Sequence, residues 1–185
     1  MEDKDLQVEN ILNRKKPQKK VDGKSKGNRT ELHLCKLFTE HFKVEFNRSV
    51  GSGNRWGQVK TLSALEKQVY AGDITPPEGF LWVIECKGGY EDQIDLNNIM
   101  PEGIRRLDLF IEQSGNDSEE CGRKPMICWK RNRRPWLAML RANDLYVIEN
   151  DFPIRITYKG WTIICLEDLL EKTAKSFWFK ESGTR

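Results

Sequence analysis

The sequence predicts a single mixed α/β domain in which helices flank a sheet of short strands. Its 185 residues have room for one domain of ordinary size and a flexible end, but not for two full domains. An apolar pattern with helical spacing comes first, and runs with the alternation or continuity of strands follow. The expected order is helix, three strands, helix and two strands, with C-terminal additions. This order favours a mixed sandwich over a doubly wound parallel sheet.

The first helix is predicted from Asn28 onward. Asn28 is a suitable N-cap, and Glu31 follows three residues later as its capping-box partner. Apolar residues recur at intervals of three and four over about four turns, as expected for an amphipathic helix. These residues are Leu32, Leu34, Cys35, Leu37, Phe38 and Phe42.

Three strands are predicted after this helix. Residues 44–50 alternate apolar and polar side chains, and Gly51, Ser52 and Gly53 end the run. The segment 54–70 is ambiguous between a short helix at 61–68 and a long loop. Residues 70–75 and the continuous apolar run 80–86 have the lengths of two paired strands, and the second is typical of a central strand.

The second half of the chain continues with a helix and further strands. Pro101 and Gly103 should break the segment from Asp95, so the main helix is expected at 104–113. Residues 126–130 and 136–141 resemble two strands joined by a basic turn. A further strand pair at 154–158 and 161–165, and a helix at 166–174, are predicted beyond them.

Residues 1–26 carry few large apolar side chains and are expected to form a flexible basic arm. The domain is therefore placed at 27–185, with a core at about 27–141 and an extension at 142–185. The first ten residues lack the apolar run of a secretory signal, and nothing approaches the length of a membrane span. We therefore expect an intracellular protein that is neither secreted nor bound to a membrane. Its five cysteines show no pairing pattern.

The charge is strongly uneven along the chain, although its net value is only +3. Residues 11–30 hold eight cations and one anion, and residues 123–134 hold six cations and no anion. Between them, residues 78–120 hold eleven carboxylates and three cations. Separated basic patches are typical of proteins that bind a polyanion, and an acidic middle can hold divalent cations. The alternative for the first patch is a solvated tail without a function.

A small group of charged residues stands at the margin of the predicted central strand. Glu85 and Lys87 are two apart and should share one face, while Cys86 points to the other. If the strands pair, Asp73 lies beside Glu85, and the two carboxylates offer the hard oxygen ligands that Mg²⁺ prefers. Lys87 could orient or deprotonate a water, or stabilise charge on a phosphate. The alternative is an ion pair at a strand end with an unrelated Asp73.

Four short segments in order resemble the PD-(D/E)XK nuclease superfamily, and within it archaeal-type Holliday-junction resolvases and their phage relatives. The resemblance covers roughly residues 26–141. The segments are Gly27-Asn28-Arg29-Thr30-Glu31, Arg48-Ser49-Val50-Gly51-Ser52-Gly53, Gly72-Asp73-Ile74 and Ile84-Glu85-Cys86-Lys87. The resemblance implies a restriction-endonuclease-like sheet with flanking helices and an Mg²⁺-dependent endonuclease, in which Mn²⁺ can substitute.

The resemblance also implies roles for individual residues. Asp73, Glu85 and the backbone carbonyl of Cys86 would bind the metal, with Glu31 assisting, and Lys87 would act on the water. Arg48 and Ser52 would contact the region of the scissile phosphate, with Ser52 among the catalytic residues. The basic residues expected on DNA are Lys19, Lys20 and Arg29 near the N-terminus and Lys130, Arg131, Arg133 and Arg134 around the basic turn.

Three functions follow from these observations. The first is a structure-selective DNA endonuclease, a Holliday-junction resolvase acting as a homodimer on branched DNA. The second is a restriction- or repair-type endonuclease acting on duplex DNA. The third is a nucleic-acid-binding module without catalysis. His33 and His41 are expected to be ordinary surface or core residues. Trp129, Trp136, Trp161 and Trp178 are expected in the core rather than stacked on bases.

Overall fold

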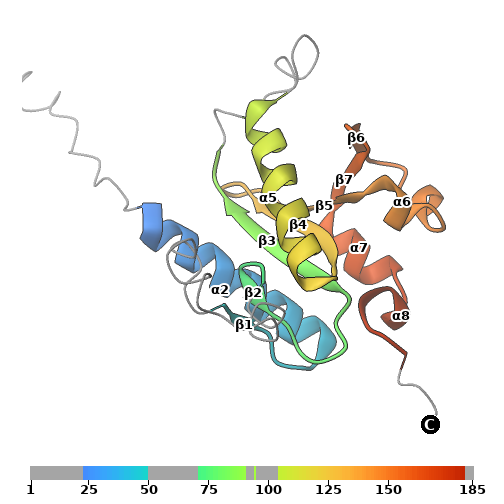
Figure 1. Ribbon diagram of the computed structural model, residues 1–185, viewed down its shortest axis with the longest axis horizontal. Helices are drawn as coiled ribbons and strands as arrows, with labels where there is room; N and C mark the ends of the chain where they lie inside the picture. Colours follow the sequence, from blue (N-terminus) through green and yellow to red (C-terminus); the bar gives the residue numbers. More distant parts are fainter. Residues whose placement is uncertain (1–22, 50–70, 91–93, 95–103, 182–185) are drawn as a thin grey trace, which may run out of the picture.

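The structure is a computed structural model that describes residues 23–49, 71–90, 94 and 104–181 (Figure 1). The main helices in this part are α2 (Gly23–Phe42), α5 (Arg105–Cys121) and α7 (Leu166–Lys172). The shorter ones are α6 (Ala142–Leu145), the 3-10 helix η3 (Glu149–Asp151) and α8 (Lys175–Trp178). The strands are β1 (Asn47–Arg48), β2 (Ile74–Thr75), β3 (Trp82–Gly88), β4 (Lys124–Lys130), β5 (Trp136–Arg141), β6 (Ile156–Tyr158) and β7 (Trp161–Cys165).

A five-stranded mixed sheet in the order β3-β4-β5-β7-β6 forms the centre of the fold. β3 and β4 are parallel, and α5 supplies the crossover connection that a parallel pair requires. β4 and β5 are antiparallel neighbours, as are β5 and β7, and β7 and β6. The predicted mixed α/β class is confirmed. The C-terminal extension forms two of the five strands of the sheet.

Helices cover both faces of the sheet, and β3 has α2 on one side and α5 on the other (Figure 1). Trp82 and Ile84 of β3 belong to a buried cluster with Leu34 and Phe38 of α2. The opposite face of the sheet packs against Leu107 and Phe110 of α5. Because successive side chains of a strand point to opposite faces, Glu85 and Lys87 project on the α5 side of β3.

Aromatic side chains fill the α2 side of the core. The ring of Phe38 lies 5.3 Å from that of Phe46 and 6.0 Å from that of Trp178, measured between centroids. Such packing contributes beyond the burial of area alone. The tryptophans named in the sequence analysis are all buried, so their predicted place in the core is confirmed; they are Trp129, Trp136, Trp161 and Trp178.

The start of the first helix differs from the prediction. α2 begins at Gly23, so Asn28 lies inside the helix and the predicted capping box of Asn28 and Glu31 is wrong. Polar side chains of the first turns bond to the helix backbone instead, as Thr30 Oγ1 does to the carbonyl of Lys26 at 3.0 Å. The segment before Asn28 has no apolar periodicity, so the pattern used to place the helix could not reveal this extra turn.

The pairing of the short strands also differs from the prediction. β2 pairs antiparallel with β1, and not along β3 as a regular hairpin. The backbone N–H of Asp73 donates to the carbonyl of Ile84 at 2.8 Å, and the N–H of Cys86 donates to the Asp73 carboxylate at 2.9 Å. The Asp73 side chain thus takes a donor that a neighbouring strand would use, which interrupts the ladder.

The predicted strand at 44–50 is shorter than expected, since only Asn47–Arg48 is paired among its described residues. The central helix is longer than predicted and runs to Cys121. Several predictions lie outside the described residues: most of the arm with Lys19 and Lys20, the turn with Ser52, the helix or loop at 54–70, and the break at Pro101 and Gly103. Within the described residues, no helix is long and apolar enough to span a membrane.

Candidate active site

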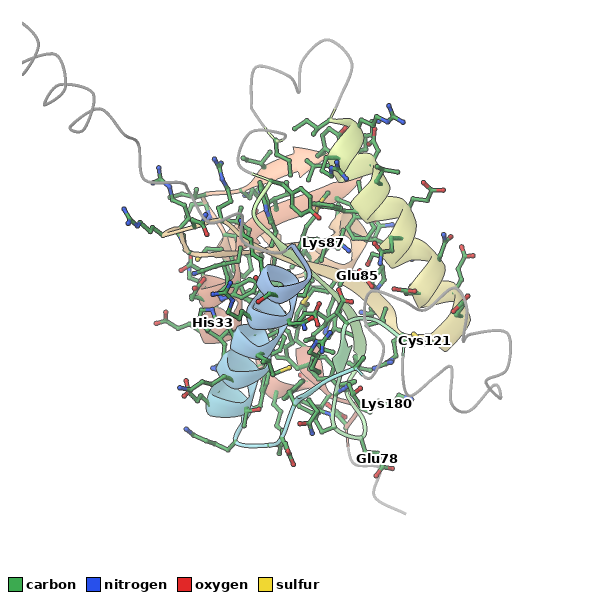
Figure 2. The ribbon with its side chains drawn as sticks, turned by 90° about the vertical axis from the view of Figure 1, so that its left-hand side faces the viewer. His33, Glu78, Glu85, Lys87, Cys121 and Lys180 are labelled. Carbon is green, nitrogen blue, oxygen red and sulfur yellow. The ribbon has the colours of Figure 1, made fainter. Side chains whose placement is uncertain are left out.

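The predicted pair on β3 lies at the centre of the site. Figure 2 shows Glu85 and Lys87 close together on β3, between α2 and α5. Lys87 Nζ lies 2.7 Å from Glu85 Oε2, and the Glu85 side chain is only 1% exposed. The β-strand spacing therefore places both side chains on one face, at the end of a strand that is otherwise apolar.

Asp73 lies beside this pair, at the edge of β3 that faces away from β4. Its Oδ2 accepts the hydrogen bond from the Cys86 N–H. In a strand, the N–H and C=O of one residue point to the same edge, so the Cys86 carbonyl also points toward Asp73. The two carboxylates and this carbonyl are the groups that the resemblance implied as metal ligands, with Glu31 assisting.

The pKa values reflect how closely these groups are packed. Burial raises the pKa of Asp73 to about 8, and the charge of Glu85 contributes further. Burial also raises the pKa of Glu85 to about 7, with Asp117 contributing and Lys87 opposing. Burial alone would lower the pKa of Lys87, but Glu85 and Asp73 outweigh it and raise this pKa. Lys87 is thus held as an ammonium, which fits charge stabilisation better than proton abstraction.

Glu31 and Arg48 lie near the site and form an ion pair with each other. Glu31 is buried on α2, and its charge is a lesser cause of the raised pKa of Asp73. α2 lies so close to β3 here that a Cβ on Gly88 would come within 2.6 Å of Thr30 Oγ1. The ion pair therefore links Glu31, which was predicted to assist the metal, to Arg48, which was predicted to contact the region of the scissile phosphate.

Two further site residues, Gln113 and Asp117 of α5, were not predicted from the sequence. Lys87 Nζ donates to Gln113 Oε1 at 2.8 Å. Asp117 lies against Glu85 and contributes to its raised pKa. Both belong to a polar stretch from Glu112 to Glu120 that has no apolar periodicity. Their spacing of four residues, one helical turn, was the signal that could have revealed them.

The residues present fit a divalent cation. Glu85 Oε1 is buried and has no hydrogen-bond partner among the residues that the structure describes, and a cation would satisfy it. Within the described ranges, no three His, Cys, Asp or Glu side chains are gathered closely enough to hold a metal by themselves. A hard cation that keeps several waters needs only one or two carboxylates, so Asp73 and Glu85 with the Cys86 carbonyl are sufficient.

The predicted basic turn lies at the same end of the sheet. Gly88, next to Lys87, pairs with Lys130, and the N–H of Gly89 donates to the carbonyl of Lys130. The turn that begins at Arg131 follows directly, and Arg133 and Arg134 are exposed. The guanidinium of Arg131 instead lies over the ring of Trp129, 5.9 Å from its centroid. Arg29 is on α2 and bonds to the carbonyl of Ser25.

A mixed sheet flanked by helices, with paired carboxylates and a lysine at the edge strand, defines a restriction-endonuclease-like protein. Residues 22–177 match the family described as "Phage putative PDDEXK endonuclease". Because this match spans most of the chain, the protein belongs to that family and to the PD-(D/E)XK superfamily. Family membership supports a nuclease, and nucleases of this superfamily typically use divalent metal ions.

One relative is also found among curated proteins. The chain is 28% identical to "Protein D14" of Escherichia phage T5 over 126 residues, which are 67% of this chain and 74% of that protein. No solved structure matches the chain significantly.

Proposed function

We propose that the protein is an Mg²⁺-dependent DNA endonuclease, with Mn²⁺ as a substitute, that acts on branched DNA as a Holliday-junction resolvase. The observation that supports this most is the position of Asp73, Glu85 and Lys87 beside the basic turn at one end of the sheet. Acidic metal ligands next to cations suit a polyanion whose phosphodiester bond is cleaved.

In this proposal the side chains of the site have separate tasks. Asp73, Glu85 and the Cys86 carbonyl would hold a divalent cation. A bound cation supplies Lewis-acid polarisation of the phosphate and acidifies water. Lys87, fixed between Glu85 and Gln113, orients the attacking water and stabilises the charge that grows on the phosphate oxygens. The water oxygen would form a bond to phosphorus and lose its proton to solvent, while the bond from phosphorus to the leaving oxygen breaks and that oxygen takes up a proton.

The basic residues would position the DNA. Arg133 and Arg134 are exposed at the turn. Arg29 is on α2, which covers the face of the sheet opposite to α5. From their charge alone, Lys19 and Lys20 are proposed to bind phosphates as well. Cations of this kind bind phosphates, which carry no sequence information, so selectivity would come from DNA shape. Arg48 would have to exchange its ion pair with Glu31 to reach a phosphate.

The test is the cleavage of labelled four-way junction, splayed duplex, linear duplex and single strand, side by side with Mg²⁺. The junction should be cleaved fastest, and Ca²⁺ should support binding without turnover. The Asp73→Asn variant is the control for a contaminating nuclease. Cleavage of linear duplex as fast as of the junction would contradict a resolvase and favour a restriction- or repair-type endonuclease. Binding with no cleavage in Mg²⁺ or Mn²⁺ would leave a binding module.

A further inference from the structure

Much of the exposed apolar surface lies in one segment, from Tyr146 to Ile156. This segment carries four of the seven large apolar side chains that are exposed in the described part of the chain. The four are Tyr146, Val147, Ile154 and Ile156, with exposed fractions of 80%, 92%, 88% and 44%. α6, which directly precedes Tyr146, packs against β5 and β7, and Ile156 begins β6. Apolar side chains gathered in this way are typical of a surface that another molecule covers.

The segment leads into a strand whose outer side is unpaired in the described part of the structure. β6 is the last strand of the sheet and pairs with β7. Both residues of the turn to β7 have positive φ, 46° at Lys159 and 78° at Gly160, as in the tight turns that suit a hairpin. Tyr158 and Trp161 close this turn as a hydrogen-bonded pair, so their N–H and C=O groups face each other.

The alternation along β6 then determines which groups face outward. Ile156 is two residues from Tyr158, so its N–H and C=O also face β7, opposite Ile163. Those of Arg155 and Thr157 point away from the sheet, where a further strand can pair with them. The Ile156 side chain lies beside Ile163, which belongs to the buried cluster on the α5 side of the sheet. Ile156 therefore extends this apolar layer to the edge of the sheet.

We propose that β6 pairs antiparallel with β6 of a second copy of this chain, about a two-fold axis at Ile156. This inference rests on the proposed function, which needs two sites on strands of opposite polarity. Ile156 then lies opposite Ile156 of the second copy, and Arg155 exchanges backbone hydrogen bonds with Thr157. An axis at Arg155 or at Thr157 would instead place Arg155 opposite Arg155 or Lys159, and like charges in these positions repel.

The proposed interface and the candidate active site are at opposite edges of the sheet. β3 is the first strand and β6 the last, so pairing at β6 leaves β3 and the basic turn open to DNA. At about 4.8 Å for each strand spacing, the two β3 strands lie at most about 45 Å apart, and each site would meet a different arm of a junction. A specific dimer buries about 800 Å² on each partner, and the four exposed side chains amount to roughly half of this area.

The first test is a cross-link across the axis, in the full chain without DNA. In Ile156→Cys the two introduced thiols face each other in a non-hydrogen-bonded pair, whose Cα atoms are about 4.5 Å apart and suit a disulfide. Oxidation with copper phenanthroline should therefore give a covalent dimer on a non-reducing gel. Val44→Cys is the matched control, since Val44 is 40% exposed and lies outside the segment, and it should stay a single chain. The wild type controls for the native cysteines.

The second test is the mass in solution by light scattering. The wild type and Val44→Asp should have twice the mass of one chain, and Ile156→Asp should have the mass of one chain, because it places two carboxylates at the axis. Circular dichroism checks that Ile156→Asp is folded, and the cross-link does not depend on this variant. A monomeric wild type, a folded Ile156→Asp that remains dimeric, or no cross-link in Ile156→Cys overturns the proposal.

These measurements are independent of cleavage. A cross-linked dimer that cleaves no DNA removes the proposed function and keeps the interface. A monomeric wild type that cleaves DNA keeps the nuclease and removes the interface. When both proposals hold, Ile156→Asp should nick a supercoiled plasmid with a cruciform and no longer linearise it, because its site on β3 is intact but unpaired.

Discussion

Asp73 and Glu85 combine a cost to stability with the capacity to bind a cation. Both have raised pKa values, because burial penalises their charged forms and a neighbouring carboxylate adds repulsion, Glu85 in the case of Asp73 and Asp117 in the case of Glu85. Asp73→Asn and Glu85→Gln remove charges that the metal-free fold accommodates poorly. We expect each to abolish cleavage and to leave junction binding close to that of the wild type. The urea midpoint should stay unchanged in Asp73→Asn, whereas Glu85→Gln should lower it, because Lys87 then loses its buried ion pair.

Lys87→Ala should differ from Asp73→Asn, because it removes the counter-charge of the buried Glu85. It should abolish cleavage and also lower the free energy of unfolding by about 3 kcal/mol. The urea midpoints of the three variants test this contrast. Cleavage at the wild-type rate by any of them, once folded, would place the site elsewhere.

Metal affinity should increase with pH. A cation displaces protons from ligands whose pKa is raised, and Asp73 and Glu85 have pKa values of about 8 and 7. Below these pH values protons occupy the carboxylates and compete with the cation, so Mn²⁺ affinity should rise from pH 6 to pH 8.5. Calorimetry in two buffers of different ionisation enthalpy should detect the released protons. A flat affinity over this range would mean that both carboxylates are already ionised at pH 6.

Gly72, the residue before Asp73, tolerates no side chain. It has a φ of +76°, and a Cβ would lie 2.7 Å from the Ile84 carbonyl oxygen, which is backbone and cannot move away easily. Gly72→Ala should therefore lower the free energy of unfolding by about 2 to 5 kcal/mol and slow cleavage by displacing Asp73.

Gly79→Ala is the matched control for Gly72→Ala, since Gly79 has a φ of +79° and open space around its Cβ position. The control should lose only the backbone contribution, about 1 to 2 kcal/mol, and should cleave normally. The urea midpoints separate the two contributions. Equal losses in the two variants would show that the contact with Ile84 is relieved without cost.

The elements that the sequence predicted best are those with strong apolar patterns. The strands near 126–130 and 136–141, and the pair after Ile154, are present because alternation and continuous apolar runs are reliable signals. α5 was predicted to end at Gln113 but runs to Cys121. The buried positions of this last part are Ser114, Ser118 and Cys121, and the first two are small and polar. Small polar residues leave no apolar period, and the same stretch holds Asp117. The site residues Gln113 and Asp117 were therefore not predicted, because they lie in a polar stretch that has no apolar period.

The basic turn between β4 and β5 is expected to bind phosphates. Replacing Arg131, Arg133 and Arg134 by Ser should weaken binding to every DNA by similar factors, and each lost contact should reduce the salt slope by about 0.9. The double variant of Arg133 and Arg134 should show most of this loss, because Arg131 packs on Trp129 and also contributes to the fold.

The matched control for the turn removes Lys175 and Lys180, two exposed cations of the C-terminal segment; Lys180 lies far from Lys87 in Figure 2. Affinity and salt slope should stay unchanged in this control. Unchanged affinity in the turn variants would assign these arginines to solubility. A loss confined to four-way junctions would instead make the turn the element that recognises the branch.

For the molecule as a whole, a single chain offers one set of Asp73, Glu85 and Lys87, whereas a junction must be cut on two strands of opposite polarity. A two-fold homodimer supplies two such sites in the required relation. We therefore predict a particle of about twice the 21.6 kDa chain mass by light scattering, and linear rather than nicked product from a supercoiled plasmid with a cruciform. Mixed dimers with one Asp73→Asn chain should give nicked product. A monomer at the assay concentration, or nicking alone by the wild type, would contradict paired cleavage and favour an enzyme that acts on one strand of a duplex.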